Sequence, residues 1–342
     1  LLGKPHPLGK RLCNVQGCVR TVDIESVGDA SHFTFFEMMG NWSLGDYFKK
    51  EKTAWTYELL TTVYGLDGDK LCSTVFEGND AAPRDEETAS LLRSLGIREE
   101  HIFYLPKSDN WWELEGTVGT PCGPDNEWFY PIDPKKKDPV FPDDYVEIGN
   151  DVYMQYRKTE TGYEPLENKN VDTGFGLDRM LLFLNGLSDG YKTDLFLPVI
   201  EKLEQISGKN YDEDEAARKA MRIIADHTRT TVMLIGDKDG ILPSNTAQDI
   251  SSAASCAAPS ATAASSAWRR APFWRAPPSS STKCTARHTP ICTKRRSISS
   301  PRSRTRQTAS KPPSRRALRN LKSACRASSA RTPSWRRRTL PT

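Results

Sequence analysis

The chain has 342 residues, of which 37% are hydrophobic and 27% are charged, and its mean hydropathy of −0.61 is low for a single fully folded unit. No stretch approaches the roughly 20 apolar residues that a membrane-spanning helix needs, so we expect a soluble protein. The net charge of +4 conceals two opposite segments: residues 1–250 contain 27 Lys/Arg and 44 Asp/Glu, whereas residues 251–342 contain 21 Lys/Arg and no acidic residue.

The predicted elements begin with an aromatic-rich stretch at 33–47, which favours a buried strand and then a turn at Gly45-Asp46. A helix from about 50 to 63, a strand at 71–77 and a charged amphipathic helix between 85 and 95 follow. Alternating apolar and polar residues predict a half-buried strand at 145–157, and prolines around three lysines indicate a surface loop at 131–142. These elements place the chain in the α+β class.

A long helix with one buried stripe is predicted near the end of the acidic segment. Its residues recur at steps of three and four: Ala217, Met221, Ile224, Thr228, Val232 and Ile235. This helix should begin a separate helical unit. The chain starts with Leu1 rather than Met, and we expect a preceding segment to be missing. Its eight cysteines form no CxxC pair, which suits a reducing cytoplasm.

The most specific stretch of the sequence is residues 34–48 (TFFEMMGNWSLGDYF), preceded by Cys18-Val19-Arg20 with a polar loop between them. It resembles motif 2 of alanyl-tRNA synthetase, a class II aminoacyl-tRNA synthetase, in which a loop joins two antiparallel strands. The resemblance implies that Arg20 binds the α-phosphate of ATP and that Phe36 stacks on the adenine. A guanidinium suits the first role because it can hold two phosphate oxygens at once and stays charged. Taken alone, an arginine in a loop is a solvated surface charge.

Residues 171–179 (VDTGFGLDR) look like motif 3 of the same class, a strand that leads through glycines into a helix. Glycine lets the backbone approach a ligand closely, and the resemblance places Gly176 and Arg179 at the ATP site, with Arg179 as a catalytic residue beside Arg20. Without motif 2 at this spacing, the pattern would be an ordinary turn before a helix.

The choice of alanine follows from residues that the family uses around its amino acid. A carboxylate must hold the α-ammonium and a small pocket must hold the methyl group, and the resemblance assigns Asp172 and Gly174 to these tasks. Trp112 matches the tryptophan that walls the family's pocket, although Trp111-Trp112 could also be core residues. Such a pocket discriminates poorly against glycine, because one methyl group is worth only about 1–3 kcal/mol.

Residues 145–156 (YVEIGNDVYMQY) match the family strand that lines the ATP site. The resemblance makes Ile148 and Asn150 contacts of ATP, and Asn150 also a contact of alanine. Glu147 is the candidate ligand of Mg²⁺, with Glu127 as a second candidate, because magnesium binds a few carboxylates together with phosphate and water oxygens. Glu147 could instead face solvent. The family carries a tryptophan where this chain has Gly149, and many members carry a histidine where it has Phe33.

Residues 224–229 (IADHTR) and 240–245 (GILPSN) resemble the entry to the family's helical domain, which recognises the tRNA acceptor stem. No cysteine or second histidine lies at ligand spacing from His227, so no zinc site is expected. The implied domains are the catalytic core at 1–205, without motif 1, the start of the tRNA-recognition domain at 206–250, and a tail at 251–342.

The tail has two interpretations. One choice of synonymous codons for residues 251–268, read in a shifted frame, encodes an arginine-rich helix of the type that the family has at this place, beginning Val-Arg-Arg-Leu-Leu-Arg-Arg. This favours a frame-shift near residue 250. The alternative is a natural basic tail that binds RNA through its phosphates. Either way, its Ser, Pro, Ala and Arg bias predicts disorder.

The resemblance therefore implies an alanine–tRNA ligase fold: an antiparallel class II sheet flanked by helices, the start of a helical domain and a basic tail. It implies ATP, Mg²⁺, alanine and tRNA(Ala) as cofactors and partners, a cytoplasmic location, and tRNA charging that is impaired in this chain. An inactive nucleotide- or RNA-binding fragment and a class II synthetase-like paralogue with another amino acid remain open. The sequence indicates neither an oligomeric state nor an editing domain.

Overall fold

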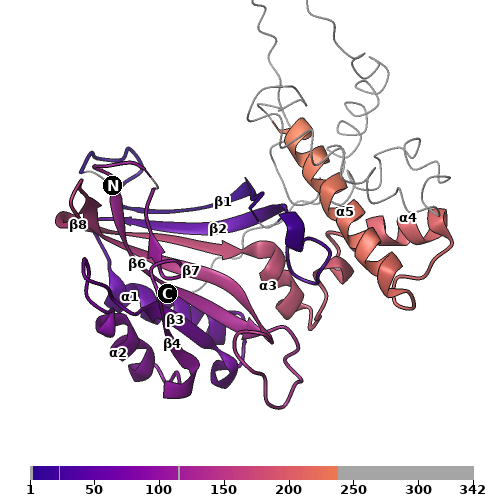
Figure 1. The fold of residues 1–342 in the computed structure, drawn as a ribbon, viewed down its shortest axis with the longest axis horizontal. Helices are drawn as coiled ribbons and strands as arrows, with labels where there is room; N and C mark the ends of the chain where they lie inside the picture. Colours follow the sequence, from indigo (N-terminus) through magenta and orange to yellow (C-terminus); the bar gives the residue numbers. More distant parts are fainter. Residues whose placement is uncertain (1–2, 23, 115, 238–342) are drawn as a thin grey trace, which may run out of the picture. The chain divides into compact units, whose positions relative to one another are not determined.

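A computed structural model describes residues 3–22, 24–114 and 116–237 of the chain, and its centre is a mixed β-sheet (Figure 1). Seven of the eight strands in these residues follow the order β1-β2-β8-β7-β6-β3-β4, and the eighth, β5, pairs with β6 beside that path. Neighbours from β2 to β3 pair antiparallel, and only β3 and β4 pair parallel. The strands are β1 (Arg11–Val19), β2 (Phe35–Leu44), β3 (Cys72–Phe76), β4 (Ile102–Leu105), β5 (Trp111–Trp112), β6 (Pro121–Pro131), β7 (Tyr145–Lys158) and β8 (Tyr163–Gly176).

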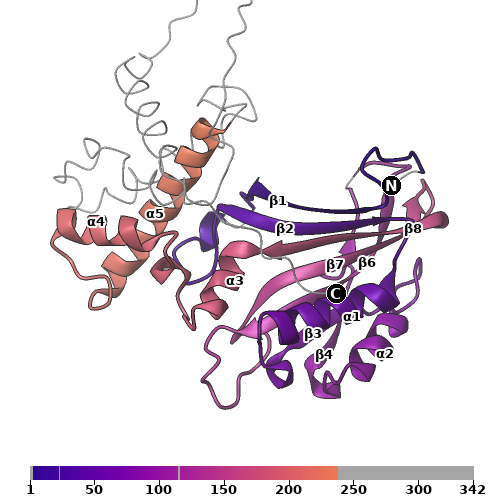
Figure 2. The same cartoon turned by 180° about the vertical axis from the view of Figure 1, so that it is seen from behind.

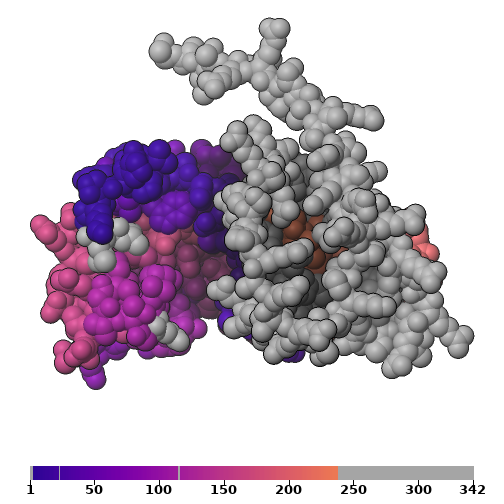
Figure 3. All heavy atoms as spheres, turned by 90° about the horizontal axis from the view of Figure 1, so that it is seen from above, coloured from indigo at the N-terminus to yellow at the C-terminus, as the bar shows by residue number. Residues whose placement is uncertain are grey.

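The first two strands form the hairpin that motif 2 predicts. The amide of Arg20 donates to the carbonyl of Thr34 at 2.9 Å, and the amide of Leu44 donates to the carbonyl of Lys10 at 2.8 Å, so the two strands run antiparallel. Strand β1 lies at the edge of the sheet and most of its side chains are exposed (indigo in Figure 3).

Helices occur where the sequence predicts them. The predicted 50–63 helix is α1 (Lys49–Glu58) with a π-helical turn (Leu59–Val63), and the predicted 85–95 helix is α2 (Glu86–Ser94), whose N-cap Asp85 accepts a hydrogen bond from the Thr88 amide at 3.1 Å. Motif 3 runs from β8 into α3 (Leu177–Leu184), and the long helix is α5 (Glu215–Gly236). The remaining elements are α4 (Leu197–Ser207) and the 3-10 turns Ile24–Ser26, Gly68–Lys70, Glu99–His101 and Gly190–Lys192.

The described residues divide into two compact units. One contains residues 3–19 and 36–193, and the other contains residues 20–35 and 194–237. Helices α1 and α2 lie together on one side of the sheet in the first unit, as the views from both sides show (Figures 1 and 2). The predicted boundary between a catalytic core and a helical domain at residue 205 stays a prediction, and the predicted tail lies outside the described residues.

A hydrophobic core fills the space between the sheet and these helices. It includes Leu60 of the π-helical turn and Leu92 of α2, packed with Val75, Trp128 and Phe175 of the sheet. Strand β7 is more buried than the half-buried strand that the sequence predicts, since an unbroken buried run extends over 151–154. The reason is its central place between β6 and β8, which the alternation of its residues does not reveal.

Among the described residues, no helix combines the length and the apolar composition that a bilayer crossing requires.

Candidate active site

One face of the sheet collects most of the residues that the sequence singles out. Directly paired residues of antiparallel strands point to the same side, and the pairing register aligns Gly40, Gly174, Asn150 and Glu127 across β2, β8, β7 and β6. We call the side to which these residues point the front face. Asp172, two residues before Gly174 on β8, belongs to the same face.

Asp172 lies opposite Trp42 on β2, and the Trp42 indole hydrogen-bonds to its carboxylate. Burial raises the pKa of Asp172, and the indole bond opposes that rise. The Trp42 ring itself lies over Gly40, because a Cβ at Gly40 would come within 2.4 Å of the ring. Asp172 is therefore a partly buried carboxylate with a neutral partner, a group that a cation would stabilise.

Gly174 lies on the same face as this carboxylate, at a crowded position. A Cβ at Gly174 would lie 2.7 Å from the Met38 sulfur and 3.7 Å from Oδ1 of Asn150. Any larger residue at Gly174 would therefore have to displace Met38. Asp172, Gly174 and Asn150 thus lie together on the front face, and their roles toward a small amino acid stay a prediction.

A group of carboxyl residues continues the front face across β6 and β7. Burial and the charges of Glu147 and Asp125 raise the pKa of Glu127 to about 9. Burial also raises the pKa of Asp125 to about 8, against a hydrogen bond from Asn110. In the part of the chain that the structure describes, no three His, Cys, Asp or Glu side chains are placed to hold a metal ion on their own. The two predicted magnesium ligands are nevertheless near each other, because the charge of Glu147 helps to raise the pKa of Glu127.

Arg179 reaches the same face from the first turn of α3. Its Nη1 donates to the carbonyl oxygen of Glu147 at 2.7 Å and lies 3.3 Å from the Glu147 carboxylate. Gly176, the N-cap of α3, lies opposite Met38 at the end of β8. Motif 3 thus places its arginine beside one of the candidate magnesium ligands.

Three further predicted residues have different surroundings. Phe36 lies on β2 four residues before Gly40, which places it on the front face, and its side chain is half-buried. Ile148 is the extra residue at a bulge between β6 and β7, and its side chain is 1% exposed in the hydrophobic core. The predicted contact of Ile148 with ATP could therefore involve its backbone but not its side chain.

The neighbouring residues Trp111 and Trp112 have different surroundings. Trp111 is a core residue, packed against Phe76, Tyr156 and Tyr163. Trp112 is half-buried and lies opposite Gly123, two residues before Asp125 on β6. The core interpretation that the sequence allowed for this pair therefore applies to Trp111, and Trp112 retains an accessible side chain.

Arg20, the predicted contact of the α-phosphate, belongs to the second compact unit. Its side chain is exposed, and its amide is bonded to Thr34. Its convergence with Asp172 and Arg179 stays a prediction.

Sequence reasoning missed a buried polar cluster on the opposite side of the same strands, the rear face. Asp151, between Asn150 and Val152, accepts hydrogen bonds from Trp128 Nε1 at 3.0 Å, Thr56 Oγ1 at 2.9 Å and Thr173 Oγ1 at 3.0 Å. Lys52 of α1 lies 3.2 Å from its carboxylate, and the side chains of this ion pair are 5% and 0% exposed. A charged residue within the apolar run of β7 was the signal that could have revealed it.

The rear face also explains how the chain accommodates glycine where its resemblance expects a tryptophan. Gly149 pairs with Phe175 of β8, and a Cβ at Gly149 would lie 2.5 Å from the Phe175 ring. The Phe175 side chain is 3% exposed in the core and occupies the space beside Gly149.

Comparison with known proteins identifies the family of the chain. The family profile described as tRNA synthetases class II (A) matches residues 1–249. The chain belongs to the class II (A) tRNA synthetases. The match ends two residues before the segment without acidic residues begins.

The curated relatives of this class II chain carry a more specific name. The chain is 52% identical over 257 residues to the alanine–tRNA ligase of Treponema denticola, covering 72% of this chain and 42% of the relative. It is 47% identical over 253 residues to the enzyme of that name from Treponema pallidum, with the same coverage. For the enzyme of that name from Rubrobacter xylanophilus the identity is 42% over 258 residues, covering 71% of this chain and 29% of the relative. The chain therefore spans less than half the length of these relatives.

Proposed function

We propose that this chain carries the active site of an alanine–tRNA ligase, which joins alanine to AMP at the expense of ATP and then transfers alanine to tRNA(Ala). The observation that carries this proposal is on the front face, where a partly buried carboxylate with a neutral partner lies two residues from a glycine at which any side chain would displace Met38. The names of the relatives agree with alanine as the amino acid.

The residues of the front face suit alanine on physical grounds. The Asp172 carboxylate would bind the α-ammonium, which would offset the cost of its burial. Gly174 carries no side chain that would compete with the methyl group of alanine, and Trp112 would limit the site against larger side chains. Asn150, half-buried between Gly174 and Glu127, would hydrogen-bond to the amino acid or to the nucleotide.

The nucleotide would lie along the front face toward α3. Arg179 is already oriented by the carbonyl of Glu147, and Gly176 and the backbone of Ile148 leave room for close approach. Phe36 would stack on the adenine, and Arg20 would bind the α-phosphate. Two guanidinium groups at the phosphates would stabilise the negative charge that develops on phosphorus.

No general base is needed for the first step. The alanine carboxylate is ionised at neutral pH and attacks the α-phosphorus in line, so that a bond to AMP forms as pyrophosphate leaves. The residues of this chain would act by orientation and charge stabilisation. In the second step the 3′-terminal ribose hydroxyl of tRNA would take the alanyl group and release AMP.

The carboxyl residues of the front face fit a magnesium ion. Glu127 and Glu147 provide hard oxygen donors, and the raised pKa of Glu127 reflects a buried carboxyl that a divalent cation would help to ionise. Magnesium bound there would supply positive charge to the phosphates of ATP. We propose no zinc site in this part of the enzyme.

The proposed reaction implies further features. We propose that residues 206–250 begin the part of the enzyme that contacts tRNA, that residues 1–205 form the catalytic core, and that the protein acts in the cytoplasm. Residues 251–342, which the family profile does not match, are proposed to be a frame-shifted product.

Alanine-dependent exchange of pyrophosphate into ATP tests the first step, and a panel of alanine, glycine, serine and larger amino acids tests its specificity. We expect exchange with alanine, weaker exchange with glycine and serine, and none with larger amino acids. ATP binding without exchange would favour an inactive nucleotide-binding fragment. Exchange with a larger amino acid would favour a paralogue, and charging of tRNA(Ala) by the same chain tests the second step.

A further inference from the structure

The loop of motif 2 packs against a helix that is distant in the sequence. Residues 20–35 and α5 belong to the same compact unit, although about 190 residues separate them. Both ends of this loop segment continue directly into β1 and β2, the strands of the motif 2 hairpin.

Three side chains along one stripe of α5 bind the backbone of this segment. Arg222 Nη1 donates to the carbonyl of Gly28 at 3.2 Å, Asp226 Oδ1 accepts from the Thr34 amide at 2.8 Å, and Arg229 Nη1 donates to the carbonyl of Phe35 at 2.6 Å. Their spacing of four and then three residues places them on one side of the helix. The helix therefore holds the segment near its middle and at its C-terminal end.

Burial makes these contacts specific. Thr34 and Asp226 are each 1% exposed and Arg229 is 3% exposed. Gly28 has φ 119°, and a Cβ there would lie 3.1 Å from Lys219 and 3.2 Å from Ile223 of α5. Only glycine allows the backbone to adopt this conformation and to approach the helix so closely.

The contact with Asp226 continues to the predicted ATP ligand. Thr34 binds Asp226 through its amide and binds the amide of Arg20 through its carbonyl, at 2.9 Å. Two hydrogen bonds through one residue thus connect the α5 carboxylate to the backbone of Arg20. His227 Nδ1 lies 2.9 Å from the other oxygen of Asp226, which fixes the carboxylate.

We infer that α5 is the positioning element of Arg20, with Asp226 as the positioning residue, so that the helical unit controls the affinity of the site for ATP. This inference rests on the proposed function. Alanine would bind to residues of the other unit, namely Asp172, Gly174 and Asn150, so a change at Asp226 should affect the two substrates differently.

The experiment compares three variants of the full 342-residue chain with the wild type. Asp226→Ala removes the acceptor of the Thr34 amide, whereas Asp226→Asn retains an oxygen that can accept it. Ala220→Gly is the control, because it loosens α5 through backbone entropy and removes no hydrogen bond to the segment. The KM values for ATP and for alanine are measured by pyrophosphate exchange, and the amides of residues 20–35 are followed by hydrogen–deuterium exchange.

We expect Asp226→Ala to raise the KM for ATP about 10-fold while the KM for alanine stays within about twofold, since one buried hydrogen bond to a charged group is lost. Asp226→Asn should restore most of the ATP affinity, and Ala220→Gly should leave both KM values near wild type. The amides of residues 20–35 should exchange faster in Asp226→Ala alone.

Equal changes in both KM values, or the same changes in Ala220→Gly, would overturn the inference, because they would indicate a general loss of structure. Unchanged amide exchange in Asp226→Ala would refute the docking of the segment whatever the activity. A wild-type chain that neither binds ATP nor exchanges pyrophosphate would instead refute the proposed function and, with it, the role of α5 toward ATP, while the amide exchange would still test the docking.

Discussion

Asp151 on the rear face of the central sheet has surroundings opposite to those of Asp172 and Glu127 on its front face, although their strands lie side by side. On the rear face, the Asp151 carboxylate is surrounded by three hydrogen-bond donors and the Lys52 ammonium. On the front face, burial is the main cause that raises the pKa values of Asp172 and Glu127, and the charges of Glu147 and Asp125 raise that of Glu127 further. Consecutive residues of one strand point to opposite faces: Thr173 points to the rear face and Gly174 to the front face.

The difference teaches which residues serve folding and which serve binding. A buried carboxylate costs free energy unless a cation or several donors accompany it. The fold supplies these partners on the rear face. On the front face we propose that substrate and metal supply them, so substitutions on the two faces should separate stability from affinity.

The largest effect is expected on the rear face. Asp151→Ala leaves the Lys52 ammonium buried without its partner, which should lower the free energy of unfolding by about 3–5 kcal/mol. Urea unfolding at neutral pH measures this. The double variant Lys52→Met/Asp151→Leu, which removes both charges, is the control and should be far closer to wild type. If the single and double variants lose the same stability, the ion pair is not the reason.

The second effect belongs to the front face. Asp172→Asn keeps the shape and removes the charge, so the KM for alanine should rise by about 100- to 1,000-fold, which corresponds to the loss of a buried charge contact of about 3–4 kcal/mol. Stability should be unchanged or slightly higher, because a desolvated carboxyl is removed. Trp42→Phe, which removes only the indole donor, should have a smaller effect on the KM. A loss of stability in Asp172→Asn like that of Asp151→Ala would contradict the contrast between the two faces.

The carboxylate of Glu113 tests whether hydrogen-bond partners can reverse the rise in pKa that burial causes. Burial alone would raise the pKa of Glu113, but hydrogen bonds from Lys158, Tyr163, Lys107 and Trp111 lower it to about 2. Because the folded-state pKa is lowered, this stabilisation is present above the ordinary pKa near 4.5 and is lost as the pH falls toward 2. Glu113→Gln should therefore cost about 1–2 kcal/mol at pH 7. Urea unfolding from pH 7 downward should show the difference from wild type narrowing below pH 5, and a constant difference would be inconsistent with this assignment.

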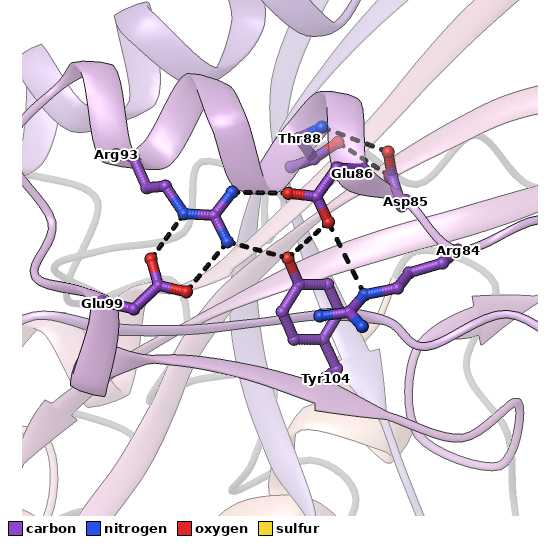
Figure 4. A network of polar contacts seen from close by, with 7 residues as sticks. All are labelled: Arg84, Asp85, Glu86, Thr88, Arg93, Glu99 and Tyr104. Carbon is purple, nitrogen blue, oxygen red and sulfur yellow. Dashed lines mark hydrogen bonds and ion pairs between the residues drawn. The ribbon is translucent and has the colours of Figure 1, made fainter.

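The smallest effect on stability is expected for ion pairs that are exposed to solvent. Arg93 of α2 lies 2.6 Å from Glu86 and 2.5 Å from Glu99, and it also donates to Tyr104, whose ring lies under Arg84 (Figure 4). The two glutamates are more than half exposed. Arg93→Ala should therefore cost about 1 kcal/mol or less, and this cost should decrease in high salt. A loss of several kcal/mol would show that exposed networks stabilise this fold as strongly as the buried cluster does.

Much of the fold could be predicted from the sequence, because its signals are local. An aromatic-rich stretch predicted β2, alternating apolar and polar residues predicted β7, and the apolar stripe predicted α5; the strand expected at 71–77 is β3. The glycines of motif 3 predicted the passage from β8 to α3. The pairing of the strands brings Asp172, Gly174 and Asn150 to one face, and their roles toward a ligand stay a prediction.

What could not be predicted depends on contacts between distant segments. The burial of Asp151 requires Lys52, which is about 100 residues away on α1. The docking of residues 20–35 on α5 depends on residues about 190 positions further along the chain. The strand pairing that buries Ile148 in the core includes a bulge, which moves this residue out of the alternation that its neighbours follow.

The pairing of Gly149 with Phe175 has a consequence for how this site can change. The two strands share one fixed volume, so a bulky ring can come from either strand but not from both. Replacing Gly149 by tryptophan would therefore require Phe175 to shrink first, and an order of substitutions that begins at Gly149 would pass through an overcrowded intermediate. Substitutions at Gly149 and Phe175 should therefore occur together in sequences that descend from this one.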